Sequence, residues 1–277
     1  NSITSSIPLA IGCITNLQGL SIESNRLSGS FPSAIVQATS LVYLNISANA
    51  FEGNLDGVDF SSLTGLESFW AGGNLFTGQL PESIFELSRL KDFSVILNGF
   101  TGGIPNSVEY AVTLELLDLS LNYLQGTIPN IWLNHILMKS FLMDGNYFTG
   151  TIPPSLYDME NLVTVSIAIN KIHGSLSSNI GSLKQLVVIP SELCLSVKLE
   201  QFLIENNMFE AEIPSCIGAL SQLEHFYANS NSLSGTIPME FDLLVNLVSI
   251  NLNNNHLQGS LPSELGTLVK LLYRIIN

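Results

Sequence analysis

The sequence of 277 residues predicts an α/β-type repeat solenoid, a fold in which short, similar coils stack along one axis. Asparagine returns every 24 residues, except for one interval of 25 and one of 37. From Asn25 onward, apolar residues at alternate positions precede each asparagine, and a Leu-x-Gly-x-Ile-Pro phrase or a close variant of it follows most of them. The asparagines are Asn1, Asn25, Asn49, Asn74, Asn98, Asn122, Asn146, Asn170, Asn207, Asn231 and Asn255.

The strand of each coil is clearest in residues 114–129. Leu117 and Leu119 are two positions apart, so on a strand their side chains point to the same face. We expect this face to be inward, where the leucines stack on those of neighbouring coils and bury area that one coil could not hide. We therefore expect the strands of successive coils to lie side by side in one parallel sheet.

The asparagine follows the strand where the backbone turns away from the sheet. Its side-chain amide both donates and accepts, so we expect it to satisfy buried N–H and C=O groups of adjacent coils. In the same coil Gly126 allows a close backbone approach, and Pro129 ends the strand pairing because it has no N–H. A convex segment that is irregular or short-helical should follow.

The phrase resembles the plant-type leucine-rich repeat, and the resemblance covers essentially the whole chain. Its copies include Leu27, Gly29, Phe31, Pro32; Phe76, Gly78, Leu80, Pro81; Phe100, Gly102, Ile104, Pro105; Phe148, Gly150, Ile152, Pro153; Leu233, Gly235, Ile237, Pro238; and Leu257, Gly259, Leu261, Pro262. The resemblance implies a right-handed superhelix or horseshoe with the parallel sheet on its concave side. Members of this family include the ectodomains of plant receptor-like kinases and receptor-like proteins, and the secreted polygalacturonase-inhibiting proteins.

We interpret residues 1–277 as a single array of about 11 repeats of 24 residues. Both ends fall inside a repeat and lack polar caps, so we expect the array to be truncated at each end. The sequence shows no apolar run of the ~18 to 20 residues that a transmembrane helix needs. The resemblance implies an extracellular position, with any membrane anchor outside this chain.

The interval from Asn170 to Asn207 is 37 residues long, 11 fewer than two repeats of 24. Aligning the flanking leucines places Ile189 at the start of a strand that Pro190 would end at once. We therefore predict a defective repeat near residues 186–195. This defective repeat could be a hinge in the sheet or the result of a faulty gene model, and we favour the faulty gene model.

The three cysteines, Cys13, Cys194 and Cys216, fit neither a zinc site nor a redox pair, and we expect no metal and no cofactor. Two alternatives remain for Cys194 and Cys216: they form a disulfide, or they are partly buried free thiols. Asn45-Ile46-Ser47 is a glycosylation sequon. Because Asn45 alternates with inward residues on its strand, we predict a solvent-facing side chain and a glycosylation site there.

The sequence contains no nucleophile elbow, zinc-binding His-Glu-x-x-His, phosphate-binding glycine loop or kinase signature, so we predict a chain that is not an enzyme. His135, His173 and His256 are interpreted as solvated loop residues. His225 instead flanks an inward phenylalanine on a strand, two positions before Tyr227. That position favours contact with a ligand over catalysis.

The formal charge of −14 disfavours binding to nucleic acid and to anionic membranes, because both need lysine and arginine. The natural complement of such a chain is a basic partner.

Outward strand positions stack into columns on the concave sheet, and they carry no lysine or arginine. From these columns we predict a ligand-binding face of Tyr43, Trp70, Asp92, Asp118, Asp144, Glu205, His225 and Tyr227. The acidic diagonal of Asp92, Asp118 and Asp144 would orient a cationic peptide or protein, and the aromatics would pack against it. The alternative is that these positions are polar simply because they face water.

Three functions are therefore compared. The leading one is a segment of a receptor ectodomain that binds a peptide or protein ligand together with a co-receptor. The second is a secreted inhibitor resembling polygalacturonase-inhibiting proteins. The third is a structural or ice-binding solenoid, suggested by Ser249, Asn251, Asn253 and Asn254, although this cluster is too local to form a flat repetitive face.

Overall fold

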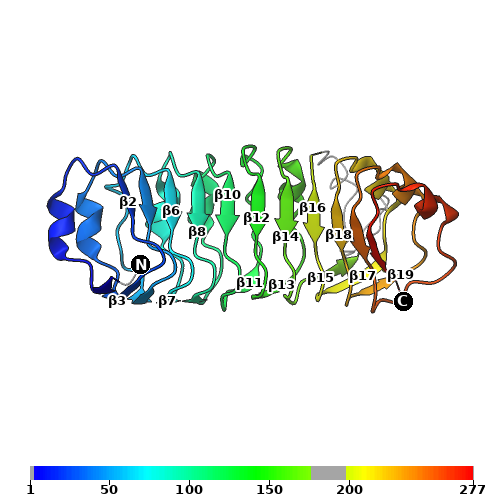
Figure 1. The fold of residues 1–277 in the computed structure, drawn as a ribbon, viewed down its shortest axis with the longest axis horizontal. Helices are drawn as coiled ribbons and strands as arrows, with labels where there is room; N and C mark the ends of the chain where they lie inside the picture. The colour runs from blue at the N-terminus through cyan, green and yellow to red at the C-terminus, as the bar shows by residue number, and fades with distance from the viewer. Residues whose placement is uncertain (1–2, 176–197, 277) are drawn as a thin grey trace. The chain divides into compact units, whose positions relative to one another are not determined.

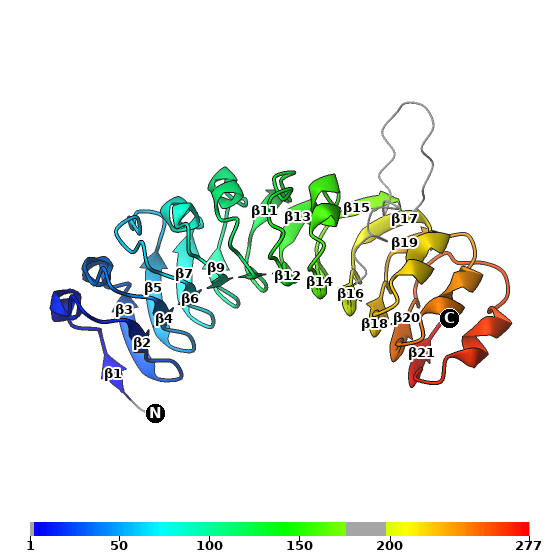
Figure 2. The same ribbon diagram turned by 90° about the horizontal axis from the view of Figure 1, so that it is seen from above.

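The computed structural model describes residues 3–175 and 198–276 (Figure 1). The chain divides into two compact units, unit 1 from Asn1 to Gly126 and unit 2 from Thr127 to Asn277. Each unit is a stack of short coils, so the predicted leucine-rich repeat solenoid is confirmed as the fold. Figure 2 shows that within each unit the strands of the main sheet line one side and the 3-10 helices the other.

The main sheet of unit 1 is parallel, and consecutive coils contribute neighbouring strands. Its order is β2 (Gly19–Ser21), β4 (Tyr43–Asn45), β6 (Ser68–Trp70), β8 (Asp92–Ser94) and β10 (Leu116–Asp118). The register aligns Leu44 with Phe69 and Phe69 with Phe93, so the central residue of each strand is inward. The parallel sheet and its inward column were both predicted from the leucine spacing.

A second parallel sheet of unit 1 lies just past the asparagines, and 3-10 helices follow it. The strands are β1 (Thr4–Ser5), β3 (Arg26–Ser30), β5 (Ala50–Asn54), β7 (Leu75–Gly78) and β9 (Gly99–Phe100), and the helices are η1 (Leu9–Cys13), η2 (Ser33–Gln37), η3 (Glu82–Glu86) and η4 (Asn106–Tyr110). An extended proline precedes each helix. Asp56 replaces that proline after β5, and there the chain forms turns instead of a helix.

Unit 2 repeats this arrangement. Its main sheet is β12 (Ser140–Leu142), β14 (Thr164–Ser166), β16 (Gln201–Leu203), β18 (His225–Tyr227), β20 (Ser249–Asn251) and β21 (Tyr273–Ile275). Its other elements are β13 (Tyr147–Thr149), β15 (His173–Ser175), β17 (Met208–Glu212), β19 (Ser232–Ser234), η5 (Pro154–Asp158), η7 (Ser215–Ala219), η8 (Met239–Leu243) and η9 (Ser263–Thr267), and β11 (Gln125–Thr127) lies at the boundary of the units. No described helix is long and apolar enough to cross a membrane.

The core of each unit is a column of inward side chains shared by neighbouring coils. In unit 1 the rings of Phe69 and Phe93 stack with centroids 5.6 Å apart, and in unit 2 those of Phe202 and Phe226 stack at 5.8 Å. All four side chains are fully buried. Burial is therefore a property of adjacent coils rather than of any single coil.

The asparagine side chains form the predicted ladder. The amide of Asn74 donates to the carbonyl of Ala71 in its own coil at 3.1 Å and to that of Ile46 in the preceding coil at 3.1 Å. Its Oδ1 accepts the N–H of Phe51 from the preceding coil at 3.0 Å. The same pattern of donors and acceptors recurs at Asn98 and Asn231. One side chain thus satisfies buried backbone groups of two coils.

The interval between Asn170 and Asn207 spans one step of this ladder. Strand β14 pairs directly with β16, with Thr164 opposite Gln201. Asn207 donates to the carbonyl of Ile167 at 2.9 Å, as each ladder asparagine does to the coil before it. Our interpretation of the interval as two repeats is therefore corrected for the main sheet, while residues 186–195 lie outside the described residues.

The convex segment of residues 129–138 corrects one histidine prediction. His135 is fully buried, with its ring 5.2 Å from that of Trp132, whereas His173 and His256 are exposed as predicted. The segment forms turns rather than a helix, which directs His135 inward. Of the cysteines, Cys13 is a free, exposed thiol and Cys216 is disulfide-bonded, while Cys194 lies outside the described residues.

The residue before each described ladder asparagine has a positive φ. Glycine and asparagine tolerate this left-handed conformation, but Ile169 adopts it at φ 53° although it is β-branched and 56% exposed. Asn206 holds the equivalent position one ladder step later, at φ 54°. Ile169 is therefore a strained position with little burial to compensate.

We predict that Asn74→Leu destabilises unit 1 by at least about 3 kcal/mol, because one backbone N–H and several carbonyls lose their partner in a buried place. Urea unfolding followed by circular dichroism measures this change. The control is Asn16→Leu at an exposed turn. Equal stability of the two variants would contradict the structural role of the ladder.

We predict that Ile169→Asn stabilises unit 2 by about 1 kcal/mol, because asparagine relieves left-handed backbone strain. The mirror variant Asn206→Ile should destabilise it by a similar amount. Thermal unfolding of both variants tests the prediction, and shifts of the same sign would refute it.

Candidate ligand-binding face

In unit 1 the predicted residues occupy outward positions of the main sheet. Tyr43 begins β4 and is 37% exposed, while Trp70 at the end of β6 and Asp92 at the start of β8 are half-buried. Asp118 ends β10 and is only 8% exposed. The register places Asp118 opposite Ser94 and Asp92 opposite Leu116, so the two acids lie diagonally on adjacent strands. Asp92 and Asp118 are therefore placed as the predicted acidic diagonal requires.

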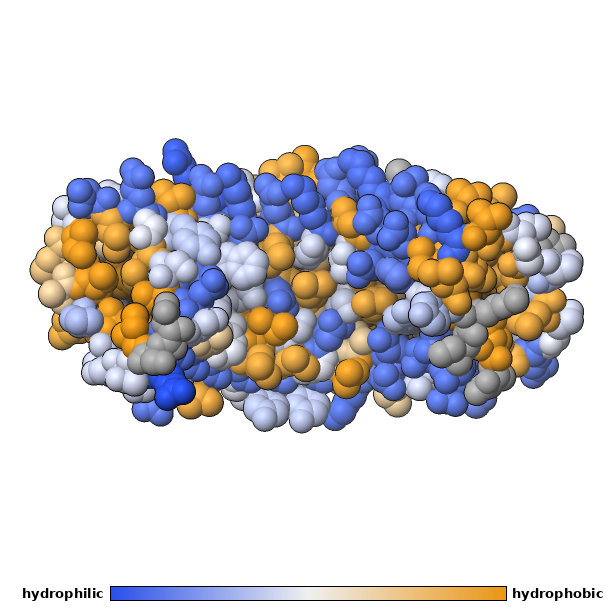
Figure 3. Space-filling model, in the orientation of Figure 1, coloured by the Kyte–Doolittle hydropathy of each residue, from blue (hydrophilic) through white to orange (hydrophobic). Residues whose placement is uncertain are grey.

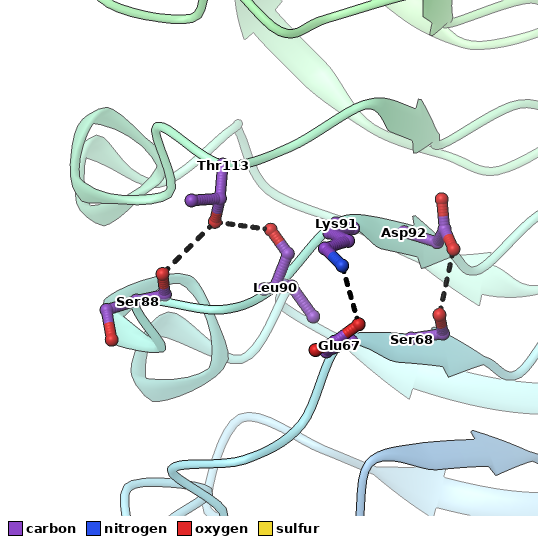
Figure 4. Close-up of polar contacts among 7 residues, drawn as sticks. All are labelled: Glu67, Ser68, Ser88, Leu90, Lys91, Asp92 and Thr113. Atoms are coloured by element: carbon purple, nitrogen blue, oxygen red, sulfur yellow. Dashed lines mark hydrogen bonds and ion pairs between the residues drawn. The ribbon is translucent and has the colours of Figure 1, made fainter.

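The acids of unit 1 are held by serines one coil away. Ser68 donates its hydroxyl to Asp92 Oδ2 at 2.8 Å, beside the ion pair of Lys91 with Glu67 at 2.7 Å (Figure 4). Asp118 accepts the Ser120 N–H at 3.1 Å and the hydroxyl of Ser94 at 3.3 Å.

Burial raises the pKa of Asp118, while the hydrogen bonds from Ser120 and Ser94 oppose that rise. The carboxyl group of Asp118 is therefore already hydrogen-bonded within the protein.

The side chain of Asn45 corrects our prediction of a solvent-facing sequon. It is 5% exposed, and its Nδ2 donates to Tyr43 Oη at 3.1 Å and to Glu23 Oε2. Its Oδ1 accepts the N–H of Ser47 at 3.0 Å. The prediction of exposure was wrong because the neighbouring outward side chains close over the amide.

In unit 2, Asp144 and Glu205 flank a small residue on the same face. Asp144, Ala168 and Glu205 hold equivalent outward positions on three consecutive coils, by the registers of β12, β14 and β16. Asp144 Oδ1 accepts the hydroxyl of Ser166 at 2.5 Å and the N–H of Ala168 at 2.8 Å. Asp144 and Glu205 thus lie on the coils to either side of Ala168.

The Glu205 carboxylate is poorly solvated and only partly satisfied. Its Oε2 is buried and has no hydrogen-bond partner among the described residues. Burial raises the pKa of Glu205, its own backbone N–H opposes that rise, and the nearby negative charge of Asp144 adds to it. A cation placed between Asp144 and Glu205 would relieve this repulsion.

His225 and Tyr227 form a polar cluster on the outward face of β18. Nδ1 of His225 lies 2.7 Å from Ser249 Oγ, which donates to Tyr227 Oη at 2.9 Å. The rings meet edge-on with centroids 6.2 Å apart. Ser249 is only 2% exposed, so its oxygen holds the two rings in place rather than presenting a nucleophile. This cluster suits contact with a ligand.

Sequence analysis did not assign a supporting role to Ser68, Ser94, Ser166 or Ser249. Each lies one coil from the acid or histidine it contacts, so the 24-residue spacing of outward positions was the available signal. Among residues 3–175 and 198–276, no group of three or more histidines, cysteines or acids could hold a metal ion. Asp144 belongs to the other unit, so the structure does not place it relative to Asp92 and Asp118.

The distribution of polarity over unit 1 supports a mixed contact surface. Figure 3 shows hydrophilic and hydrophobic side chains interspersed on the drawn face of this unit rather than one continuous apolar area. A surface of this kind suits a ligand that is recognised by polar groups and packing together.

Comparison with known proteins agrees with the fold. The leucine-rich repeat family model matches residues 16–37 and 246–268. No curated protein sequence matches the chain. The plant peptide hormone receptor RGFR1, solved in complex with RGF2, is 29% identical over 99% of this chain and 42% of its own, with a TM-score of 0.89.

Two further solved structures are similar. The leucine-rich repeat ectodomain of the receptor kinase GASSHO1/SCHENGEN3 from Arabidopsis thaliana, in complex with CASPARIAN STRIP INTEGRITY FACTOR 2, is 26% identical over 99% of this chain and 34% of its own, with a TM-score of 0.82. A plant ice-binding protein is 23% identical over 93% of this chain and 78% of its own, with a TM-score of 0.74, a likeness of fold alone. The chain spans less than half of each receptor chain.

We predict that Glu205→Gln stabilises unit 2 at pH 7 but has little effect near pH 4. The folded pKa of Glu205 lies above its ordinary value of 4.5, so the folded state binds more protons between the two values. The stability that Glu205 contributes is therefore present below pH ~4.5 and is lost as the pH rises through the raised pKa. Thermal unfolding at both pH values measures this dependence.

The control is Glu210→Gln on the exposed part of β17. A stabilisation by Glu205→Gln that is equal at pH 4 and pH 7 would contradict the buried, unpartnered carboxylate.

Proposed function

We propose that this leucine-rich repeat solenoid is part of the extracellular recognition domain of a receptor-like kinase or receptor-like protein. Its ligand is a basic peptide or protein that binds the outward face of the main sheet. A co-receptor is the second partner, and the chain itself acts by binding rather than by catalysis.

The similar receptor ectodomains support a peptide ligand, because RGFR1 and GASSHO1/SCHENGEN3 were solved with RGF2 and CASPARIAN STRIP INTEGRITY FACTOR 2 respectively. A further similar structure, the receptor kinase HAESA, was solved with the peptide hormone IDA and the co-receptor SERK1 at 26% identity and a TM-score of 0.62. The disulfide at Cys216 supports an extracellular location, since disulfides persist in oxidising compartments.

The main support for a basic ligand is the pair of carboxylates, Asp144 and Glu205, on either side of Ala168. Asp144 and Glu205 repel each other, and Glu205 has an oxygen without a partner among the described residues. Outward strand positions offer no lysine or arginine to neutralise them. An arginine or lysine side chain of the ligand would supply the missing positive charge, and His225 and Tyr227 would pack against the neighbouring part of the peptide.

The predicted contact residues Tyr43, Trp70, Asp92 and Asp118 lie on the outward face of unit 1. The acids there are already bonded to Ser68, Ser94 and Ser120, so they attract a cation less strongly than the pair in unit 2.

The two alternatives have weaker support. A secreted polygalacturonase-inhibitor-like protein would use the same outward face, and a longer transcript that encodes a membrane span would exclude it. The ice-binding alternative was suggested by the cluster of Ser249, Asn251, Asn253 and Asn254, but the Ser249 side chain is buried and bonded to His225 and Tyr227. It therefore adds nothing to a flat, exposed, repetitive face.

Selection of a displayed random peptide library on the chain should enrich arginine and lysine. The double variant Asp144→Asn with Glu205→Gln should weaken the selected peptides at least tenfold, a change of about 1.4 kcal/mol. Isothermal titration at two salt concentrations measures affinity, and the affinity should fall as salt increases.

The matched control is Glu210→Gln with Glu212→Gln on β17, which removes two charges away from this face. Enrichment of acidic peptides, or equal weakening by the control, would refute the proposed ligand.

A further inference from the structure

Unit 1 carries two aromatic side chains on its outward face that its core does not use. Tyr43 is 37% exposed and Trp70 is half-buried. The register puts Tyr43 opposite Ser68 and Asn45 opposite Trp70, so the aromatics are diagonal neighbours on adjacent strands. In contrast, the inward rings of this unit, such as Phe69, are fully buried. Both outward side chains are therefore available to a ligand.

Fixed polar groups surround this aromatic pair. Asn45 Nδ2 bonds Tyr43 Oη at 3.1 Å and the Glu23 carboxylate, which orients the phenol ring. On the other side of Trp70, Asp92 is held by Ser68 at 2.8 Å (Figure 4). The indole N–H of Trp70 makes no hydrogen bond within residues 3–175 and 198–276, so it can donate to a ligand.

These groups suit one chemical class of ligand. A pyranose ring has a face of C–H groups that packs on the electron-rich face of an aromatic ring, and its equatorial hydroxyls pair with planar carboxylates and with N–H donors. The absence of lysine and arginine from the outward strand positions disfavours sugars that carry carboxylate or sulfate groups. An uncharged sugar therefore fits better than an anionic one.

The geometry of the sheet suits a chain of sugars. Neighbouring strands are ~4.8 Å apart, a spacing similar to the length of one sugar ring. Consecutive sugars could therefore lie over β4, β6 and β8, with Tyr43 and Trp70 beneath them and the carboxylates of Glu23 and Asp92 at either end.

A cationic peptide fits unit 1 less well. Its most buried acid, Asp118, is 8% exposed and bonded to Ser94 and Ser120, and Asp92 is bonded to Ser68. A cation would have to compete with these bonds, whereas stacking on the rings requires no rearrangement.

We propose that unit 1 binds a neutral oligosaccharide by stacking on Tyr43 and Trp70, with hydroxyls bonded to Glu23, Asp92 and the Trp70 indole N–H. This site is separate from the peptide contacts at Asp144 and Glu205 in unit 2, so the two proposals stand independently.

Tryptophan fluorescence tests the site directly. The chain has two tryptophans, and Trp132 is fully buried against Phe141, so a ligand on this face should change the emission of Trp70. The full chain is screened on an array of neutral and anionic oligosaccharides and then titrated with the neutral hexamers cellohexaose and chitohexaose and with anionic oligogalacturonate. We expect a saturable change with at least one neutral hexamer and none with the anionic one.

Variants identify the site by isothermal titration with the bound hexamer. Trp70→Ala should weaken binding at least tenfold, and Trp70→Phe should retain part of it. Tyr110→Ala should leave binding unchanged, because Tyr110 is an exposed tyrosine on η4 rather than on this sheet face. Asp144→Asn with Glu205→Gln should also leave sugar binding unchanged, which separates this site from the peptide site.

Three results would overturn the proposal. They are no binding of any neutral oligosaccharide on the array, preferred binding of oligogalacturonate, and equal affinity of Trp70→Ala and wild type when circular dichroism shows both to be folded.

Discussion

The asparagine ladder is the constraint on which the rest of the structure depends. At Asn74 one side chain accepts a backbone N–H and donates to carbonyls of two coils, in a place where unpaired groups would be costly. No aliphatic side chain supplies both donors and an acceptor. The ladder therefore fixes where each coil turns, and the strands before it and the second sheet after it take their positions from that turn. It also passes directly from the coil of Asn170 to Asn207, although the intervening chain is 13 residues longer than a normal repeat of 24.

Because the ladder and the inward column satisfy the coil's own requirements, the outward strand positions are free to vary in chemistry. The two units use that freedom differently. In unit 1 the carboxylates of Asp92 and Asp118 are bonded to serines one coil away. The aromatic side chains of Tyr43 and Trp70 are therefore the main groups available to a ligand there. In unit 2 the carboxylates of Asp144 and Glu205 repel each other beside a small residue. The same scaffold thus presents a stacking surface in one unit and a site that attracts cations in the other.

Most of the fold could be predicted from the sequence because each repeat position has one physical role. The strand spacing, the ladder bonds and the convex helices after proline all follow from residues such as Leu117, Asn122 and Pro105. The failures lie where a side chain's environment depends on a neighbouring coil. Asn45 alternates outward as expected, yet Tyr43 and Glu23 cover it. His135 is buried because its convex segment forms turns and packs it on Trp132. The direct pairing of β14 with β16 could not be predicted, because an insertion in one repeat and a shortened pair of repeats give the same 37-residue interval.

Hydrogen exchange at the ladder amides tests the central claim most directly. The N–H groups of Phe51 and Phe100 in unit 1 and of Phe209 in unit 2 are bonded to asparagine Oδ1 atoms of the following coil at 3.0 Å. If the ladder holds the coils together, these amides exchange as slowly as the amide of Ile46 just after β4, which donates to the carbonyl of Trp70 at 2.8 Å. If these amides exchange as fast as amides in exposed turns, the asparagine side chains do not hold adjacent coils together, which contradicts the structural role of the ladder.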